Sequence, residues 1–168
     1  LLDWDTPVTW LDTSGMDFKE EFVGETFGRI NKEEAGLLLK ELEAYIQRIG
    51  GNRILEERID FGLISPYKAQ VQYLRGKIKG SASLRPYRSL ITVNTVDGFQ
   101  GQERDVIFIS LVRANEERQI GFLNDLRRMN VAITRARMKL VILGEAATLS
   151  HHAFYKKLLE YVRTINDK

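Results

Sequence analysis

Three uninterrupted apolar runs constrain the fold of this chain more than any other feature. They span residues 61–64, 106–109 and 140–143, and the last two contain only Val, Ile, Leu and Phe. A strand with one face in water alternates apolar and polar residues, whereas a strand of a parallel sheet is covered on both faces and stays apolar. The runs therefore predict strands buried on both faces. Residues 6–12 and 90–93 predict two more strands.

Helical patterns lie between these runs. Asn31 is a predicted helix cap with Glu34 at capping-box spacing, an apolar stripe follows, and Gly50 with Gly51 predicts the helix end. Further helices are predicted after residues 65–66, after the cap residues 124–125, and at the C-terminus. The C-terminal stripe comprises Phe154, Leu158, Tyr161, Val162 and Ile165. Residues 80–88 and 114–121 are predicted loops, the second one mobile. Alternating strands and helices predict an α/β fold with a mainly parallel central sheet flanked by helices.

Composition excludes several kinds of site. The 168 residues contain no Cys, and the two His are adjacent, so disulfide scaffolds, thiolate metal sites and Ser-His-Asp triads have no support. No apolar run approaches the ~18–20 residues that span a bilayer, and the N-terminus lacks a signal-peptide pattern. We expect a single cytoplasmic domain with no membrane partner. Because the chain lacks an initiator Met, we expect it to be excised from a longer protein.

Charge is divided unevenly along the chain. Residues 1–60 carry 7 Lys or Arg against 14 Asp or Glu, a net −7, and residues 61–168 carry 18 against 9, a net +9. The basic part permits a polyanionic partner, such as a nucleotide or a nucleic acid. A solvated surface of mixed charge is the simpler explanation of the same numbers.

The connection at residues 94–105 is the most informative segment. It joins two predicted strands, and strand ends are where α/β proteins bind ligands. Gly98 and Gly101 permit close backbone approach or a positive φ, and Thr95 supplies a hydroxyl. These residues suit a phosphate, although a glycine turn that merely packs would have the same composition.

A second segment, residues 127–137, contains four arginines just before a buried strand. A guanidinium can grip a phosphate through two parallel hydrogen bonds and always stays charged. Arginines in water, or arginines ion-paired to the acidic N-terminal part, would produce the same pattern.

Together the two segments resemble a known family. Residues 95–105 (TVDGFQGQERD) are similar to motif V of the Upf-like branch of superfamily-1 helicases, and residues 128–137 (RMNVAITRAR) to their motif VI. Residues 64–70 (ISPYKAQ) resemble motif IV. The motifs stand in the family's order, and the resemblance covers nearly the whole chain. It implies a RecA-like three-layer fold, with residues 1–168 as the second, C-terminal RecA-like domain.

The resemblance also implies roles for individual residues. Arg135 corresponds to the motif VI arginine finger that reaches the γ-phosphate of ATP, and it is the expected catalytic residue. The expected nucleotide-binding residues are Gly101, Glu103 and Gln70. The residues expected to bind nucleic acid are Ser65, Pro66, Tyr67, Thr95 and Asp97. For Tyr67 a core position is favoured over a stacking role, and Gln70 could equally be helical surface. The arginines expected to be structural are Arg127, Arg128 and Arg137.

The catalytic apparatus implied by the family is incomplete here. The sequence has neither the phosphate loop Gly-x-x-x-x-Gly-Lys-Ser/Thr nor an apolar strand ending in Asp-Glu. ATP with Mg²⁺ would therefore be shared with a preceding RecA-like domain that holds the metal, and no metal ligand is expected in this chain.

The prediction is the C-terminal motor domain of an ATP-dependent DNA or RNA helicase that binds single-stranded nucleic acid and is inactive in isolation. Two alternatives stay open: a non-hydrolysing clamp on nucleic acid, and a different nucleotide-binding α/β enzyme. Against a dinucleotide enzyme, residues 13–15 (TSG) do not supply Gly-x-Gly-x-x-Gly after the first strand.

Overall fold

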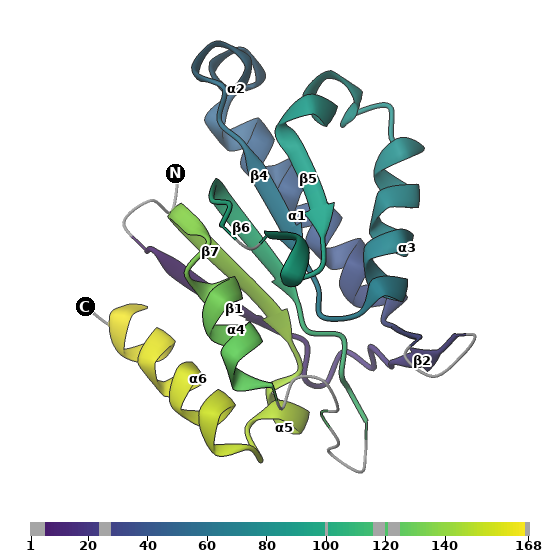
Figure 1. Ribbon diagram of the computed structural model, residues 1–168, viewed down its shortest axis with the longest axis vertical. Helices are drawn as coiled ribbons and strands as arrows, with labels where there is room; N and C mark the ends of the chain where they lie inside the picture. Colours follow the sequence, from purple (N-terminus) through teal and green to yellow (C-terminus); the bar gives the residue numbers. More distant parts are fainter. Residues whose placement is uncertain (1–5, 24–27, 100, 116–119, 121–124, 167–168) are drawn as a thin grey trace.

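Five strands form one fully parallel sheet in the computed structural model, which describes residues 6–23, 28–99, 101–115, 120 and 125–166 (Figure 1). In chain order they are β1 (Val8–Asp12), β4 (Phe61–Ile64), β5 (Ile91–Asn94), β6 (Arg104–Ser110) and β7 (Ala136–Gly144). Their order in the sheet is β1-β7-β6-β4-β5. A short antiparallel pair, β2 (Glu21–Phe22) and β3 (Arg29–Ile30), lies outside this sheet.

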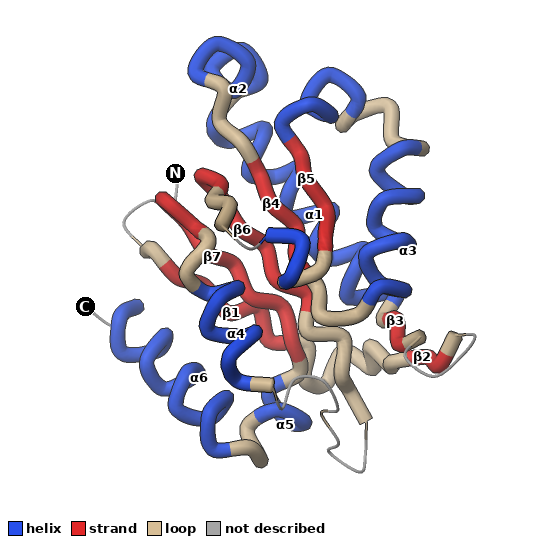
Figure 2. Tube along the Cα trace, in the orientation of Figure 1, coloured by secondary structure: helices blue, strands red, loops and turns tan. Residues whose placement is uncertain are grey.

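Helices cover both faces of the sheet and produce three layers (Figures 1 and 2). They are α1 (Lys32–Ile49), α2 (Gly51–Glu57), α3 (Lys68–Lys79), α4 (Leu126–Ile133), α5 (Ala146–Leu149) and α6 (Ala153–Asn166). α1 and α3 pack on one face, and α4 and α6 pack on the other. The 3₁₀ turns η2 (Arg85–Leu90) and η3 (Asp97–Phe99) flank β5. The predicted α/β, RecA-like three-layer arrangement is confirmed.

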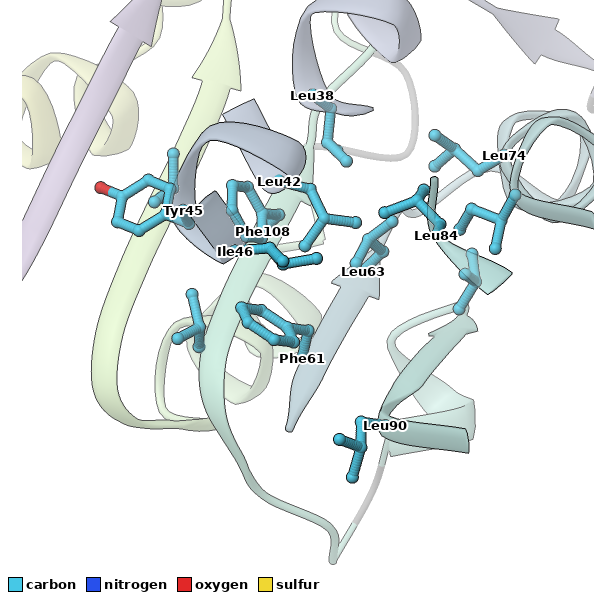
Figure 3. Packing of buried hydrophobic residues seen from close by; sticks show 14 of the residues in the cluster. Leu38, Leu42, Tyr45, Ile46, Phe61, Leu63, Leu74, Leu84, Leu90 and Phe108 are labelled. Carbon is cyan, nitrogen blue, oxygen red and sulfur yellow. The ribbon is translucent and has the colours of Figure 1, made fainter. Parts of the chain in front are cut away.

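The core consists of two apolar clusters, one on each face of the sheet. Alternate residues of a strand point to opposite faces, so Phe61 and Phe108 join α1 and α3, whereas Ile64 and Ile107 join α4 and α6. Figure 3 shows the first cluster, in which the rings of Tyr45 and Phe108 meet edge to face with centroids 5.7 Å apart. The strand sequences are apolar throughout because both of their faces are buried.

The connection from β5 to β6, residues 95–103, passes over β4 and is called the crossover below. β4 lies between β5 and β6 in the sheet, and Val96 and Phe99 of the crossover are buried in the second cluster. Gly62 of β4 provides the space, because a Cβ there would lie 2.6 Å from Ile107 Cδ1 and 2.9 Å from Phe99 Cε1. The crossover can therefore pack directly on the strand.

Asn31 caps α1 as predicted, with its Oδ1 accepting a hydrogen bond from Glu34 N at 3.0 Å. The reciprocal contact of a capping box is replaced by a longer-range one. Asn31 N donates to Gln70 Oε1 at 3.0 Å, and the carboxylate of Glu34 instead accepts from Ser110 Oγ at 2.6 Å. The start of α1 is thus joined to α3 and to the end of β6.

Several predicted details were wrong. The predicted end of the first helix at Gly50 is confirmed, but the short helix α2 that follows it was not predicted. η2 begins inside residues 80–88, which were predicted as loop. Tyr161 is 61% exposed, although it was assigned to the apolar stripe of the last helix. A helix places positions i, i+4 and i+7 on one face, and the buried positions of α6 are Tyr155, Leu159 and Val162. Most of the loop predicted at 114–121, and the side chain of residue 165, lie outside the described residues.

Candidate nucleotide and nucleic-acid site

The predicted site residues lie at two opposite edges of the sheet. Residues 65–67 follow β4, and Thr95 and Asp97 follow β5, so they lie at the carboxyl ends of the strands. Gly101 and Glu103 precede β6, and Arg135 precedes β7, so they lie at the amino ends. The crossover joins the two edges, so the motif V segment contributes to both.

Arg135 is held against both the motif VI helix and the motif V segment. Its Nε donates to Val131 O at 3.1 Å, its Nη2 to Thr134 Oγ1 at 3.1 Å, and its Nη1 to Gln102 O at 3.4 Å. The backbones also meet, since Arg104 N donates to the carbonyl oxygen of Arg135 at 3.0 Å. The half-buried guanidinium therefore has a defined position next to the loop that carries Gly101 and Glu103.

The two glycines of the crossover lack a side chain for different reasons, and their contact with a phosphate stays a prediction. Gly101 has φ +76°, a left-handed conformation that side chains disfavour, and the space around its Cα is open. Gly98 is a close-approach position, because a Cβ there would lie 2.1 Å from Cγ of Asn94. Glu103 next to them has an exposed side chain, and its carbonyl oxygen accepts from Arg104 Nη1 at 2.7 Å.

Gln70 does not lie with Arg135 at the amino edge. Its side chain is fully buried near the start of α3, so it is not helical surface. Its Oε1 accepts from Asn31 N, and its Nε2 donates to Asn31 O and Ser110 Oγ, all at 3.0 Å. The whole amide is therefore engaged in joining α1, α3 and β6. A contact between Gln70 and nucleotide stays a prediction.

Among the predicted nucleic-acid residues, Ser65 and Tyr67 are buried. Ser65 Oγ accepts from Tyr67 N at 3.3 Å. The Tyr67 hydroxyl donates to Ile120 O at 3.3 Å and accepts from Arg113 Nη1 at 3.2 Å, so the core position favoured for this ring is confirmed. Side chains at least partly exposed at this edge are Pro66, Thr95 and Asp97.

The remaining arginines of the motif VI segment differ in their contacts. Arg128 forms an ion pair with Asp97 at 3.2 Å, which ties the start of α4 to the crossover, and a local pair with the helix cap Asp125 at 3.4 Å. Arg137 pairs with Asp60 at 2.9 Å and Asp105 at 3.1 Å, and the hydrogen bond that its guanidinium donates to Asp105 raises the pKa of the guanidinium. Both arginines thus make the structural contacts expected of them, whereas Arg127 has an exposed side chain.

Sequence reasoning missed the buried carboxyl group of Glu34. Burial raises its pKa to about 7, although Oε1 accepts hydrogen bonds from Ser110 Oγ and, at 2.8 Å, from Val112 N. Val112 adopts φ +69°, where the chain turns out of β6. The only sequence signal for this residue was its capping-box spacing, which indicates a local role and not a contact with a residue 76 positions away.

Three further observations bear on ligands. In the described parts of the chain, no group of three or more His, Cys, Asp or Glu side chains could hold a metal ion. None of the described helices is both long and apolar enough to cross a membrane. Two surface hollows of about 350 and 380 Å³ lie around β1 and α5, and no predicted site residue lines them.

Comparisons with known proteins agree with the sequence motifs. The family described as "AAA domain" matches residues 1–147. The chain is 39% identical over 149 residues to the DNA polymerase alpha-associated DNA helicase A of Saccharomyces cerevisiae, covering 88% of this chain and 20% of that protein. It is 34% identical over 162 residues to an uncharacterized ATP-dependent helicase of Methanocaldococcus jannaschii, covering 96% and 21%.

A third relative is the regulator of nonsense transcripts 1 homolog of Drosophila melanogaster, 37% identical over 161 residues, with 94% of this chain and 13% of that protein covered. The chain therefore spans about a fifth or less of the length of these relatives. The family match, the helicase relatives and the three-layer parallel fold lead to one assignment: the chain belongs to the AAA domain family, as a RecA-like helicase domain of the Upf-like branch of superfamily 1.

Proposed function

We propose that this chain is the C-terminal motor domain of an ATP-dependent helicase acting on DNA or RNA, and that residues 1–168 form one RecA-like domain of a longer protein. The observation that carries the proposal is the position of Arg135, fixed beside Gly101 and Glu103 at the amino edge of the sheet. The helicase names of the relatives support it. ATP binds between this edge and the preceding RecA-like domain.

The amino edge has the chemistry to contact a nucleoside triphosphate. Gly101 leaves its backbone open to a phosphate, and the exposed carboxylate of Glu103 can accept hydrogen bonds from a ribose. Phosphoryl transfer spreads negative charge over the γ-phosphate oxygens, and a fixed guanidinium such as that of Arg135 stabilises this charge. The described residues offer no carboxylate cluster for Mg²⁺, so the metal is assigned to the preceding domain.

Single-stranded nucleic acid binds along the carboxyl edge in this proposal. The residues with accessible surface for it are Pro66, Thr95 and Asp97. Three buried residues hold this edge in place through hydrogen bonds: Ser65, Tyr67 and Gln70. In this proposal ATP and the single-stranded nucleic acid bind at opposite edges of the sheet, and the crossover joins these edges. Movement of the crossover would therefore change the contacts of both ligands.

Steady-state ATPase assays of the full-length protein, with single-stranded nucleic acid at a saturating concentration, test the role of Arg135. Arg135→Ala is expected to lower kcat by ~10³–10⁵, the usual effect of losing an arginine finger, while ATP binding changes much less because the contact strengthens in the transition state. Arg135→Lys should restore little, since an ammonium lacks the planar fork of donors.

Arg137→Ala is the matched control, because it removes a nearby arginine whose guanidinium is already paired with Asp60 and Asp105. The Arg137 side chain is 43% exposed, which weakens its ion pairs through solvent screening. Arg137→Ala should therefore lower the unfolding free energy by only about 1 kcal/mol and leave kcat close to wild type. Near-normal kcat for Arg135→Ala, with loss of activity in Arg137→Ala, would show that the finger is assigned to the wrong arginine.

A further inference from the structure

The hydroxyl group of Thr134 lies between the end of α4 and the guanidinium of Arg135. Its Oγ1 donates to Val131 O at 2.9 Å and accepts from Arg135 Nη2 at 3.1 Å. A hydroxyl has a single proton, and here that proton is committed to the carbonyl. A lone pair of Oγ1 therefore faces the guanidinium, and the direction of the contact is fixed.

The hydrogen bonds of Arg135 use some of the N–H groups of its guanidinium and leave others without a partner among the described residues. A guanidinium carries five N–H groups in a rigid, planar fork. The Nε and Nη2 groups on one side bond to Val131 O and Thr134 Oγ1, and Nη1 bonds to Gln102 O. The two N–H groups that remain, one on each Nη atom, have no acceptor among the described residues. A guanidinium binds phosphate oxygens through N–H groups of this kind.

We propose that Thr134 is a positioning residue for the arginine finger, which presents the two remaining Arg135 N–H groups to the γ-phosphate. The proposal rests on the function proposed above for Arg135. Thr134 does not touch the nucleotide: it fixes the rotation of the guanidinium about its long side chain. The last turn of α4 assists, because carbonyl groups at a helix C-terminus attract a cation. Without Thr134, the plane is held by the Val131 carbonyl and by the longer 3.4 Å contact from Nη1 to Gln102 O, and the Nη2 group has no contact of its own.

The location of Thr134 makes this role separable from folding. Its side chain is exposed and belongs to neither core cluster. Thr134→Val keeps the branched shape and removes the hydroxyl, and Thr134→Ser keeps the hydroxyl. Thr164 on α6 provides a matched control, because its exposed Oγ1 also donates to a helix carbonyl, Glu160 O at 2.9 Å, and no arginine contact accompanies it.

The test measures ATPase activity of the full-length protein with saturating single strand, together with thermal melting. Thr134→Val is expected to lower kcat by about 3- to 30-fold, the range for losing one hydrogen bond that orients a reacting group, with KM for ATP changed less than about twofold. Thr134→Ser should keep kcat near wild type. Thr164→Val should leave kcat unchanged and should change Tm by no more than Thr134→Val does.

A double variant shows whether the two residues act together. In an Arg135→Ala background, Thr134→Val should cause no further loss of kcat, because the group that it positions is gone. An additive loss would overturn the proposal, and so would a normal kcat in Thr134→Val when Arg135→Ala is inactive. If Arg135→Ala itself kept normal kcat, the finger assignment would fail first, so the failures of the two proposals are distinguishable.

Discussion

Glu34 is an ionisable group inside the protein, and its environment determines how stability depends on pH. Burial raises its pKa from 4.5 to about 7, against the opposing effect of hydrogen bonds from Ser110 and from backbone N–H groups. Between these two values the folded chain keeps the proton and the unfolded chain releases it. The stabilisation from this residue is therefore complete below about pH 4.5 and is lost as the pH rises to about 7.

The pH dependence can be measured by denaturant unfolding of the 168-residue chain between pH 4.5 and 8. We expect Glu34 to lower the unfolding free energy by about 3 kcal/mol across this interval, at 1.36 kcal/mol per pKa unit. Glu34→Gln, which cannot ionise, should remove this part of the slope. The slope is the proper readout, because Glu34 Oε2 has no hydrogen-bond partner in the structure and an amide there changes stability at every pH.

Glu33 offers the control for this measurement, since it is the adjacent residue of the same helix and its side chain is exposed. Glu33→Gln should leave the slope unchanged. If the unfolding free energy of wild type and Glu34→Gln changed with pH in the same way, Glu34 would be ionised in the folded state throughout this range. That result would contradict the raised pKa of its buried carboxyl group.

At the scale of elements, the contact between the crossover and β4 depends on the absence of a side chain at Gly62. An added Cβ would approach Ile107 Cδ1 to 2.6 Å and Phe99 Cε1 to 2.9 Å. Both neighbours are fully buried, and packed cores accommodate an extra methyl group only by displacing side chains and backbone. The substitution should therefore shift the crossover, which carries the backbone that contacts Arg135.

Gly62→Ala is expected to lower the unfolding free energy by about 1–3 kcal/mol, the usual cost of overpacking. Gly76→Ala is the control, because Gly76 lies in α3 with nothing within 4 Å of an added Cβ. There alanine should be neutral or stabilising by about 0.5–1 kcal/mol through its helix propensity. Denaturant unfolding of the two variants checks both values, and an equal effect of both would contradict close packing of the crossover.

The strands and most helices were predictable because their signals are local. Residues 106–109 and 140–143 are apolar at every position, and double burial in a parallel sheet is the simplest cause. The helical phase of α6 was harder, since Phe154-Tyr155 and Leu158-Leu159 are adjacent apolar pairs and either member could face the core. The sequence pattern does not distinguish them: the second member of each pair is buried, and the first is partly buried and packs against the second apolar cluster.

Features that depend on distant partners were not predictable from the sequence. Gln70 is 39 residues from Asn31, and no local pattern indicates that its amide would replace one half of a capping box. The division of the motif V segment between two edges follows from β5 and β6 both running parallel to β4. The strand order was needed only to show that the crossover passes over β4. For Arg135 and Arg137, the sequence resemblance indicated distinct roles, and the two arginines make different contacts.

In the molecule as a whole, the acidic first third and the basic remainder are partly paired with each other. Arg137 joins Asp60, and the buried Arg113 joins Glu20 at 3.0 Å. These contacts account for some of the uneven charge along the chain without any ligand. Arg135 differs from them, because its described contacts are to carbonyl and hydroxyl oxygens and its positive charge is not neutralised by a carboxylate.

In the function proposed above, that uncompensated charge is one half of an ATPase site. The chain contains no Gly-x-x-x-x-Gly-Lys-Ser/Thr loop to hold the phosphates, and a finger accelerates hydrolysis only when nucleotide and water are already in place. We therefore expect the purified 168-residue chain to show no ATP turnover above background, and the full-length protein to hydrolyse ATP when single strand is added. The measurement is phosphate release at matched protein concentrations, with Arg135→Ala of each length as the control. Turnover by the 168-residue chain that disappears in its Arg135→Ala variant would place a complete active site within this domain, contrary to the division of roles proposed for the two RecA-like halves.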